Sequence, residues 1–184
     1  MNNIQFLTDV DYVFNDYIGG FSSLEEKIIN KYAIHPILHL FSGVSEIGKY
    51  RVDINPNSKA NIIEDVFEFI EDCQLEFNTI LLDPIYCNEH REEIWRTKYY
   101  DNNAIDKEKL YVFPYDTRKT KLLWDFFERK YPKRIIIKSL NHYTIPNYIL
   151  LQGFNIYPGA FKPNRCISIY QAKNNNLDQY NKST

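Results

Sequence analysis

The chain has 184 residues, enough for one domain with a sizeable hydrophobic core. Its formal net charge of -2 excludes the overall positive charge of a general nucleic-acid binder, so any such binding must depend on local patches. The N-terminal residues show no signal-peptide pattern and no stretch approaches 18 apolar residues, so we expect a cytoplasmic protein without a membrane partner.

Seven short apolar runs predict β-strands. In chain order they are Ile34–Phe41, Tyr50–Ile54, Asn61–Asp65, Phe77–Leu82, Arg134–Ser139, Phe154–Tyr157 and Ile167–Gln171. Runs of this kind are typical of central strands in a parallel sheet that is covered on both faces. Turn residues between the last two runs, among them Pro158 and Gly159, predict a hairpin and hence an antiparallel last strand.

Three helices are predicted over Ser23–Tyr32, Glu89–Tyr100 and Thr117–Lys130. The first begins with a serine followed three residues later by glutamate, the pattern of a capping box. Alternating strands and helices predict an α/β fold. Only about six residues join the first strand to the second and the second to the third, which predicts extended crossovers rather than helices there. We expect one domain over residues 1–172 and a polar, disordered tail over residues 173–184.

Four short motifs stand in order at the ends of predicted strands: LFSG at Leu40–Gly43, VDINP at Val52–Pro56, IIEDV at Ile62–Val66 and LDPIY at Leu82–Tyr86. Together they resemble class I S-adenosylmethionine-dependent methyltransferases, especially the DPPY-type enzymes that methylate amino groups of nucleic acids (adenine N6 or cytosine N4). The resemblance covers roughly residues 17 to 172. It implies a Rossmann-like, mostly parallel sheet of seven strands with an antiparallel last strand, and S-adenosylmethionine as cofactor.

The resemblance also implies which residues bind that cofactor. They are Tyr17, Gly19, Gly20, Phe41, Ser42, Gly43, Asp53, Ile54, Asp65, Val66 and Asp83. In the family pattern, the LFSG loop and the YIGG segment (residues 17–20) lie at the methionine part. The resemblance implies that Asp53 accepts hydrogen bonds from the ribose hydroxyls. It also implies that Asp65 holds the adenine amino group, with the amide of Val66 at the ring.

Several of these residues also have a plainer interpretation. Gly43 could serve any tight turn. Asp53 could start a turn before Asn55, and Asp65 could begin a helix on the surface. The YIGG segment could be an ordinary turn before the first helix. These alternatives stay open at the level of the sequence.

The LDPIY motif is the most specific of the four. An exocyclic amine is a poor nucleophile because its lone pair is delocalised into the ring. The Asp83 carboxylate and the Pro84 carbonyl can each accept a hydrogen bond from this amine, which favours a pyramidal nitrogen with a localised lone pair. Tyr86 offers a flat face on which an extruded base can stack. Such catalysis is mostly positioning and electrostatics. Ile85 stands where the family usually has a second proline, and an ordinary turn at a strand end is the alternative.

Basic and flat residues are expected at the same edge of the sheet as the motifs, where they could contact nucleic acid. They are Arg91, Arg96, Arg118, Lys119, Lys121, His142, Tyr143, Phe161, Lys162 and Arg165. The alternative is a set of solvated surface residues. The three cysteines form no CxxC pair and the histidines show no ligand-like spacing, so we expect free thiols and no metal site.

The sequence therefore predicts an S-adenosylmethionine-dependent methyltransferase that acts on adenine N6 in DNA. Two alternatives stay open: the same chemistry on RNA or on cytosine N4, and a non-catalytic scaffold that binds the cofactor. The sequence leaves the oligomeric state undetermined.

Overall fold

A computed structural model describes residues 3–9, 20–86, 111–157 and 164–173. Its main sheet has eight strands: β1 (Ile4–Thr8), β2 (Ile37–Leu40), β3 (Tyr50–Asp53), β4 (Ile62–Ile63), β5 (Thr79–Leu82), β8 (Arg134–Ser139), β9 (Tyr148–Tyr157) and β10 (Arg165–Ala172). They lie in the order β1-β9-β10-β8-β5-β2-β3-β4. Only β10 runs antiparallel to its neighbours, β8 and β9, so the sheet is mixed but mostly parallel. The α/β class and the antiparallel last strand are confirmed.

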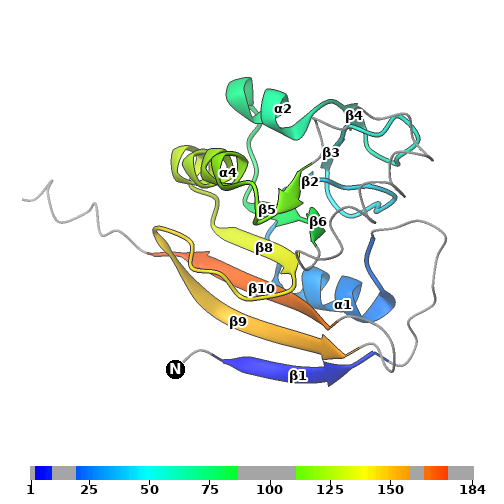
Figure 1. Ribbon diagram of the computed structural model, residues 1–184, viewed down its shortest axis with the longest axis vertical. Coiled ribbons are helices and arrows are strands. Elements are labelled where there is room, and N and C mark those ends of the chain that lie inside the picture. The colour runs from blue at the N-terminus through cyan, green and yellow to red at the C-terminus, as the bar shows by residue number, and fades with distance from the viewer. Residues whose placement is uncertain (1–2, 10–19, 87–110, 158–163, 174–184) are drawn as a thin grey trace, which may run out of the picture.

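The eighth strand, β1, is the main departure from the prediction of seven. It pairs in parallel with β9 and forms the outer edge of the sheet (Figure 1). Four of its five residues are exposed. Because an edge strand buries so little, its sequence contains no continuous apolar run. β9 also begins at Tyr148 rather than Phe154, since Gln152 and Gly153 interrupt the apolar pattern that the prediction followed.

The described helices are α1 (Ser23–Tyr32), α2 (Val66–Asp72) and α4 (Thr117–Lys130). α1 and α4 have the predicted bounds, and the capping box of α1 is present between Ser22 and Glu25. α2 was not predicted as a helix. The helix predicted over Glu89–Tyr100 and the tail from residue 174 lie outside the described residues.

The helices cover opposite faces of the sheet. On one face α2 and α4, which lie side by side in Figure 1, pack on Leu38, Leu40 and Leu82. On the other face α1 packs on the alternate residues Ile37 and Leu81 and reaches across to β9 and β10. Both faces of the central strands are therefore buried, as their apolar sequences indicate.

The two short connections contain no helix, as predicted: residues 41–49 join β2 to β3, and residues 54–61 join β3 to β4. A separate pair of short parallel strands, β6 (Ile85–Tyr86) and β7 (Val112–Phe113), follows the carboxyl end of β5.

Candidate functional site

The four motifs lie together at the carboxyl ends of four adjacent strands. The register aligns Leu40 of β2 with both Leu82 of β5 and Val52 of β3. The backbone N–H of Asp83 donates to the Leu40 carbonyl at 3.3 Å, and that of Ser42 donates to the Val52 carbonyl at 3.0 Å. The loops that follow β2, β3, β4 and β5 therefore begin side by side at one edge of the sheet.

The LFSG loop has an unusual backbone. Phe41 has φ 59° and Gly43 has φ 52°, both in the left-handed region. That conformation is uncommon for a residue with a bulky side chain, and such outliers cluster at functional sites. The Phe41 ring stacks on Tyr111 with the ring centroids 5.6 Å apart.

Ser42 is 1% exposed, and among the described residues its hydroxyl has no hydrogen-bond partner. A buried hydroxyl without a partner costs about 1–3 kcal/mol, so such groups usually satisfy a ligand or a water molecule. Ser42 is therefore the residue of this loop that most directly indicates a bound polar group.

Asp53 lies at the end of β3 and is buried. Its Oδ2 accepts from the Gly43 N–H at 2.7 Å and its Oδ1 accepts from the Asn55 N–H at 2.8 Å. Burial raises the pKa of Asp53, while the bonds from Asn55 and Gly43 oppose that rise. The turn-starting interpretation is thus correct. Each carboxylate oxygen still has a second acceptor direction, and the ribose contact stays a prediction.

Asp65 is the N-cap of α2, and its carboxylate accepts from the Phe67 N–H at 2.7 Å. The structure therefore confirms that Asp65 begins a helix, which explains why an acidic residue stands there, but Asp65 is buried rather than on the surface. Val66 is the first residue of α2 and is buried, whereas Ile54, which follows β3, is half-buried. The adenine contact stays a prediction.

Asp83 does not face solvent, because its side chain is 4% exposed. Its Oδ2 accepts from the Gly20 N–H at 3.1 Å, and its Oδ1 lies 3.6 Å from Lys138 Nζ. Two residues predicted for the site, Gly20 and Asp83, are thus in contact. Pro84 is buried. The backbone of Tyr86 lies in β6, while its side chain, and the whole of Tyr17 and Gly19, lie outside the described part of the chain.

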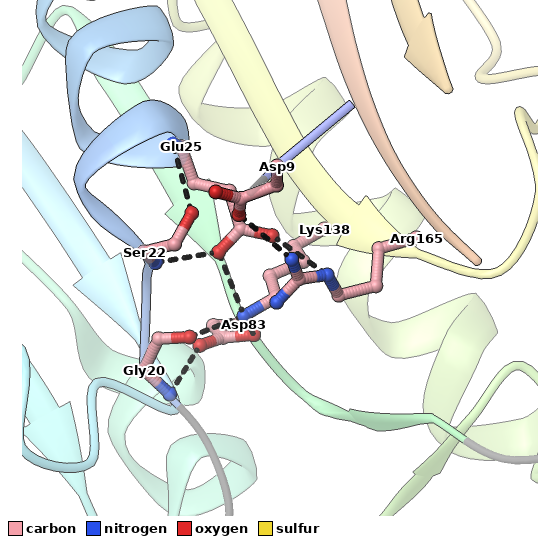
Figure 2. Close-up of polar contacts among 7 residues, drawn as sticks. All are labelled: Asp9, Gly20, Ser22, Glu25, Asp83, Lys138 and Arg165. Carbon is pink, nitrogen blue, oxygen red and sulfur yellow. Dashed lines mark hydrogen bonds and ion pairs between the residues drawn. The ribbon is translucent and has the colours of Figure 1, made fainter. Parts of the chain in front are cut away.

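Asp83 belongs to a buried ion cluster, which Figure 2 shows. Its members are Asp9, Glu25, Asp83, Lys138 and Arg165, each with a side chain at most 5% exposed. Lys138 Nζ lies 3.4 Å from Glu25 Oε2. Arg165 lies 3.2 Å from Glu25 Oε1 and 3.0 Å from Asp9 Oδ2. The cluster joins segments that are far apart in the sequence, at the end of the sheet that carries LDPIY.

Burial and the neighbouring charges of this ion cluster set the pKa of Asp83. Burial raises the pKa of Asp83 to about 6; the ammonium of Lys138 opposes the rise, and the nearby Glu25 adds to it. Lys138 also donates to the Gly20 carbonyl, so the same ammonium contacts both Gly20 and Asp83. Asp83 therefore ionises close to neutral pH, in the range useful for a group that exchanges protons.

Sequence reasoning missed Glu25 and Lys138 as members of the site. A signal for Lys138 was present, because a lysine inside the apolar strand RIIIKS must have a buried acceptor. Arg165 was predicted to face nucleic acid, and this was wrong: its guanidinium is buried against Asp9 and Glu25.

The other residues predicted to contact nucleic acid differ in their exposure and their partners. Arg118 is exposed, Lys119 lies over the Phe67 ring at 5.2 Å, and Lys121 pairs with Asp125. His142 and Tyr143 are half-buried. Arg91, Arg96, Phe161 and Lys162 lie outside the described ranges.

No protein-family model matches the chain, and no curated protein matches it. Within the described ranges, no helix has the length and apolar character needed to cross a membrane. The same residues include no group of three or more His, Cys, Asp or Glu side chains that could hold a metal ion. Cys73 and Cys166 are free thiols, and both are buried.

Proposed function

We propose that this chain is an S-adenosylmethionine-dependent methyltransferase that methylates adenine N6 in DNA. The observation that carries the proposal is the meeting of four motif-bearing strand ends at one edge of the sheet, with LFSG directly beside LDPIY. Ligands of open α/β sheets bind outside the carboxyl ends of the strands.

The strand order supports a Rossmann-like interpretation of the sheet. Counted from β2, the strands β4-β3-β2-β5-β8-β9 follow the order 3-2-1-4-5-6 of that fold, with the reversed β10 inserted before the last. The order of the sheet reverses between β2 and β5, which is the topological switch point where such folds bind nucleotides. LFSG and LDPIY follow those two strands.

The residues present fit an S-adenosylmethionine site. Ser42 offers a buried hydroxyl that no described residue satisfies, and the left-handed Gly43 brings backbone close to any ligand at the switch point. Asp53 retains acceptor directions for ribose hydroxyls. Asp65 and Val66 would lie at the adenine ring. The chemistry that the cofactor supplies is an electrophilic methyl group on a positively charged sulfur.

In this proposal the LDPIY residues prepare the amine. The bound cofactor would supply a methyl group to this amine, which must then give up one proton. The Asp83 carboxylate and the Pro84 carbonyl accept hydrogen bonds from the amine, and a carboxyl whose pKa is about 6 can take the proton. Since Gly20 covers the Asp83 carboxylate, the amine reaches it when the chain at Gly20 moves away.

A second candidate function is cofactor binding without transfer. The observation that favours it is the engagement of Asp83 by Gly20 and Lys138, which leaves its side chain 4% exposed. A carboxylate in that position could serve as a structural partner alone.

The experiment is methyl transfer from S-adenosylmethionine to unmethylated DNA and, in parallel, to RNA, read by mass spectrometry of the nucleosides. Calorimetry measures cofactor binding to the same samples. Asp83→Asn removes the charge while keeping the shape, and Asp72→Asn is the matched control, because Asp72 is an exposed aspartate at the end of α2.

N6-methyladenine in DNA, lost in Asp83→Asn and kept in Asp72→Asn, supports the proposal. Product only in RNA, or N4-methylcytosine, keeps the mechanism and changes the substrate. Cofactor binding without any product supports the second candidate. Absence of cofactor binding by the folded protein would contradict both.

A further inference from the structure

A cavity of about 560 Å³ lies at the same edge of the sheet but away from the four motifs. It is bordered by β1, β9, the start of β10 and the loop after β8. Its lining residues are Phe6, Leu7, Thr8, Leu140, Asn141, His142, Asn155, Ile156, Tyr157, Asn164 and Cys166. The volume is within the range of sites that hold small organic molecules.

The cavity and the ion cluster lie on opposite faces of the sheet. Side chains of successive strand residues point to opposite faces. Arg165 belongs to the ion cluster, whereas the next residue, Cys166, lines the cavity. Likewise, Thr8 lines the cavity, whereas the next residue, Asp9, belongs to the ion cluster. Ligands in the cavity therefore do not contact Asp83.

The side chains that line the cavity are uncharged. Among its described lining residues there is no Asp, Glu, Lys or Arg. Burial lowers the pKa of His142, so this histidine is neutral at pH 7. A charged ligand would lack an opposite charge there and would lose its hydration. The cavity therefore suits a neutral group.

Three asparagines supply hydrogen-bonding groups at the cavity, and two aromatic residues supply flat apolar surfaces. Asn155 Oδ1 accepts from Cys166 Sγ at 3.1 Å and lies 3.0 Å from His142 Nε2, which fixes the orientation of this amide. The amide of Asn155 thus borders the cavity in a fixed orientation, and Asn164 adds an exposed amide. Phe6 is 81% exposed and Tyr157 is 50% exposed, although both are large apolar side chains.

We propose that this cavity binds an uncharged nucleobase. Amide groups match the donor and acceptor pattern at a base edge, and aromatic side chains stack on base faces. Contact with a base would also cover Phe6. The base could belong to a free nucleoside or to a polynucleotide. This inference goes beyond the proposed methyl transfer, because it concerns the other face of the sheet and does not require the cofactor.

The experiment follows backbone and asparagine side-chain NMR signals of the full chain. Adenosine, guanosine, cytidine, thymidine and a short single-stranded oligonucleotide are titrated separately, and indole serves as a probe for a merely apolar cavity. Phe6→Ala removes the exposed ring at little cost to the fold. Leu122→Ala is the matched control, because Leu122 is an exposed apolar residue on α4, away from the cavity.

We expect at least one nucleoside to shift the signals of lining residues in β1, β9 and residues 140–142. Phe6→Ala should weaken that binding about fivefold or more, the lower end for one base–aromatic stack, and Leu122→Ala should leave it unchanged. A response to the oligonucleotide indicates a base within a strand, and a response to nucleosides alone indicates a free nucleoside. The proposal is overturned if neither binds, if indole shifts these signals as strongly, or if the two variants behave alike. Because the readout is binding, these outcomes are independent of methyl transfer.

Discussion

One edge of the sheet has two very different sides. On the side of α1, five ionisable groups lie buried together; on the opposite side, beside β1 and β9, the cavity contains no charge among its described lining residues. The same strands supply both, since Arg165 and Cys166 are neighbours that face opposite ways. The comparison shows how a period of two residues lets one strand separate a charged environment from a neutral one.

The charged side should be far less tolerant of substitution. Glu25 contacts both Lys138 and Arg165, so Glu25→Gln leaves two buried cations short of negative charge. Removing one partner from a buried ion pair costs about 3–5 kcal/mol. We expect a loss of that size in the free energy of unfolding, measured with urea.

The control for this prediction is Glu26→Gln on the same helix, because Glu26 is exposed. It should change the free energy of unfolding by less than about 0.5 kcal/mol. Equal losses in the two variants would show that the ion cluster contributes no more than a surface charge does.

The neutral side makes the opposite prediction for chemical reactivity. Burial raises the pKa of the Cys166 thiol from 9 to about 11, and its single S–H lies within reach of two acceptors, the Leu140 carbonyl and Asn155 Oδ1. At neutral pH this shift lowers the thiolate fraction about 100-fold, and the thiolate is the reactive form. Alkylation of Cys166, followed by mass spectrometry of its peptide, should therefore be about 100-fold slower in the folded chain than in urea. Equal rates would contradict a neutral, low-polarity environment.

Acid titration of stability distinguishes two buried groups on the α1 side of the sheet, His39 and Asp83. His39 of β2 is fully buried and its pKa falls to about 3, so the unfolded chain gains a proton below pH 6.5 that the folded chain does not. This extra proton uptake by the unfolded chain lowers the free energy of unfolding as the pH falls. Asp83, with its pKa raised to about 6, has the opposite effect between pH 6 and pH 4, where the folded chain holds the extra proton.

Asp83→Asn removes that opposing contribution. The free energy of unfolding should then fall more steeply with acidity between pH 6 and pH 4, by up to about 1.4 kcal/mol per pH unit. Urea unfolding at pH 4, 5 and 6 measures the slope. His39→Gln is the converse variant and should make the slope shallower or reverse it. A slope that neither variant changes would show that both groups titrate normally.

Much of the fold follows from local patterns in the sequence. The capping box at Ser22 and Glu25 and the apolar run RIIIKS predict α1 and β8 with the correct bounds. β1 was missed because its residues are mostly exposed, and its pairing with β9 joins positions about 150 residues apart in the sequence. No window of local sequence contains that information.

The candidate site was predictable only at the strand ends. The motifs indicated Asp53, Asp65 and Asp83, and the local partners of the first two, the amides of Asn55 and Phe67, agree with the turn and helix-start interpretations, whereas the partners of Asp83 come from other segments. Asp83 meets Gly20, 63 positions away, and Lys138, 55 positions further along. The inward orientation of Asp83 depends on those contacts, and so does its pKa. Sequence spacing therefore located the Asp83 carboxylate without revealing what it binds.

The smallest expected effect on the charged side is the influence of Lys138 on the pKa of Asp83. The ammonium of Lys138 lowers the pKa of Asp83, so Lys138→Met should raise that pKa above about 6, by about one unit for a charge at this distance. Carbon-13 NMR titration of the Asp83 carboxyl measures this without any substrate. Lys133→Met is the control, because Lys133 is exposed just before the same strand. If methyl transfer occurs, the acid limb of its pH profile should move upward by the same amount. A pKa of Asp83 unchanged by Lys138→Met would show that burial alone sets it.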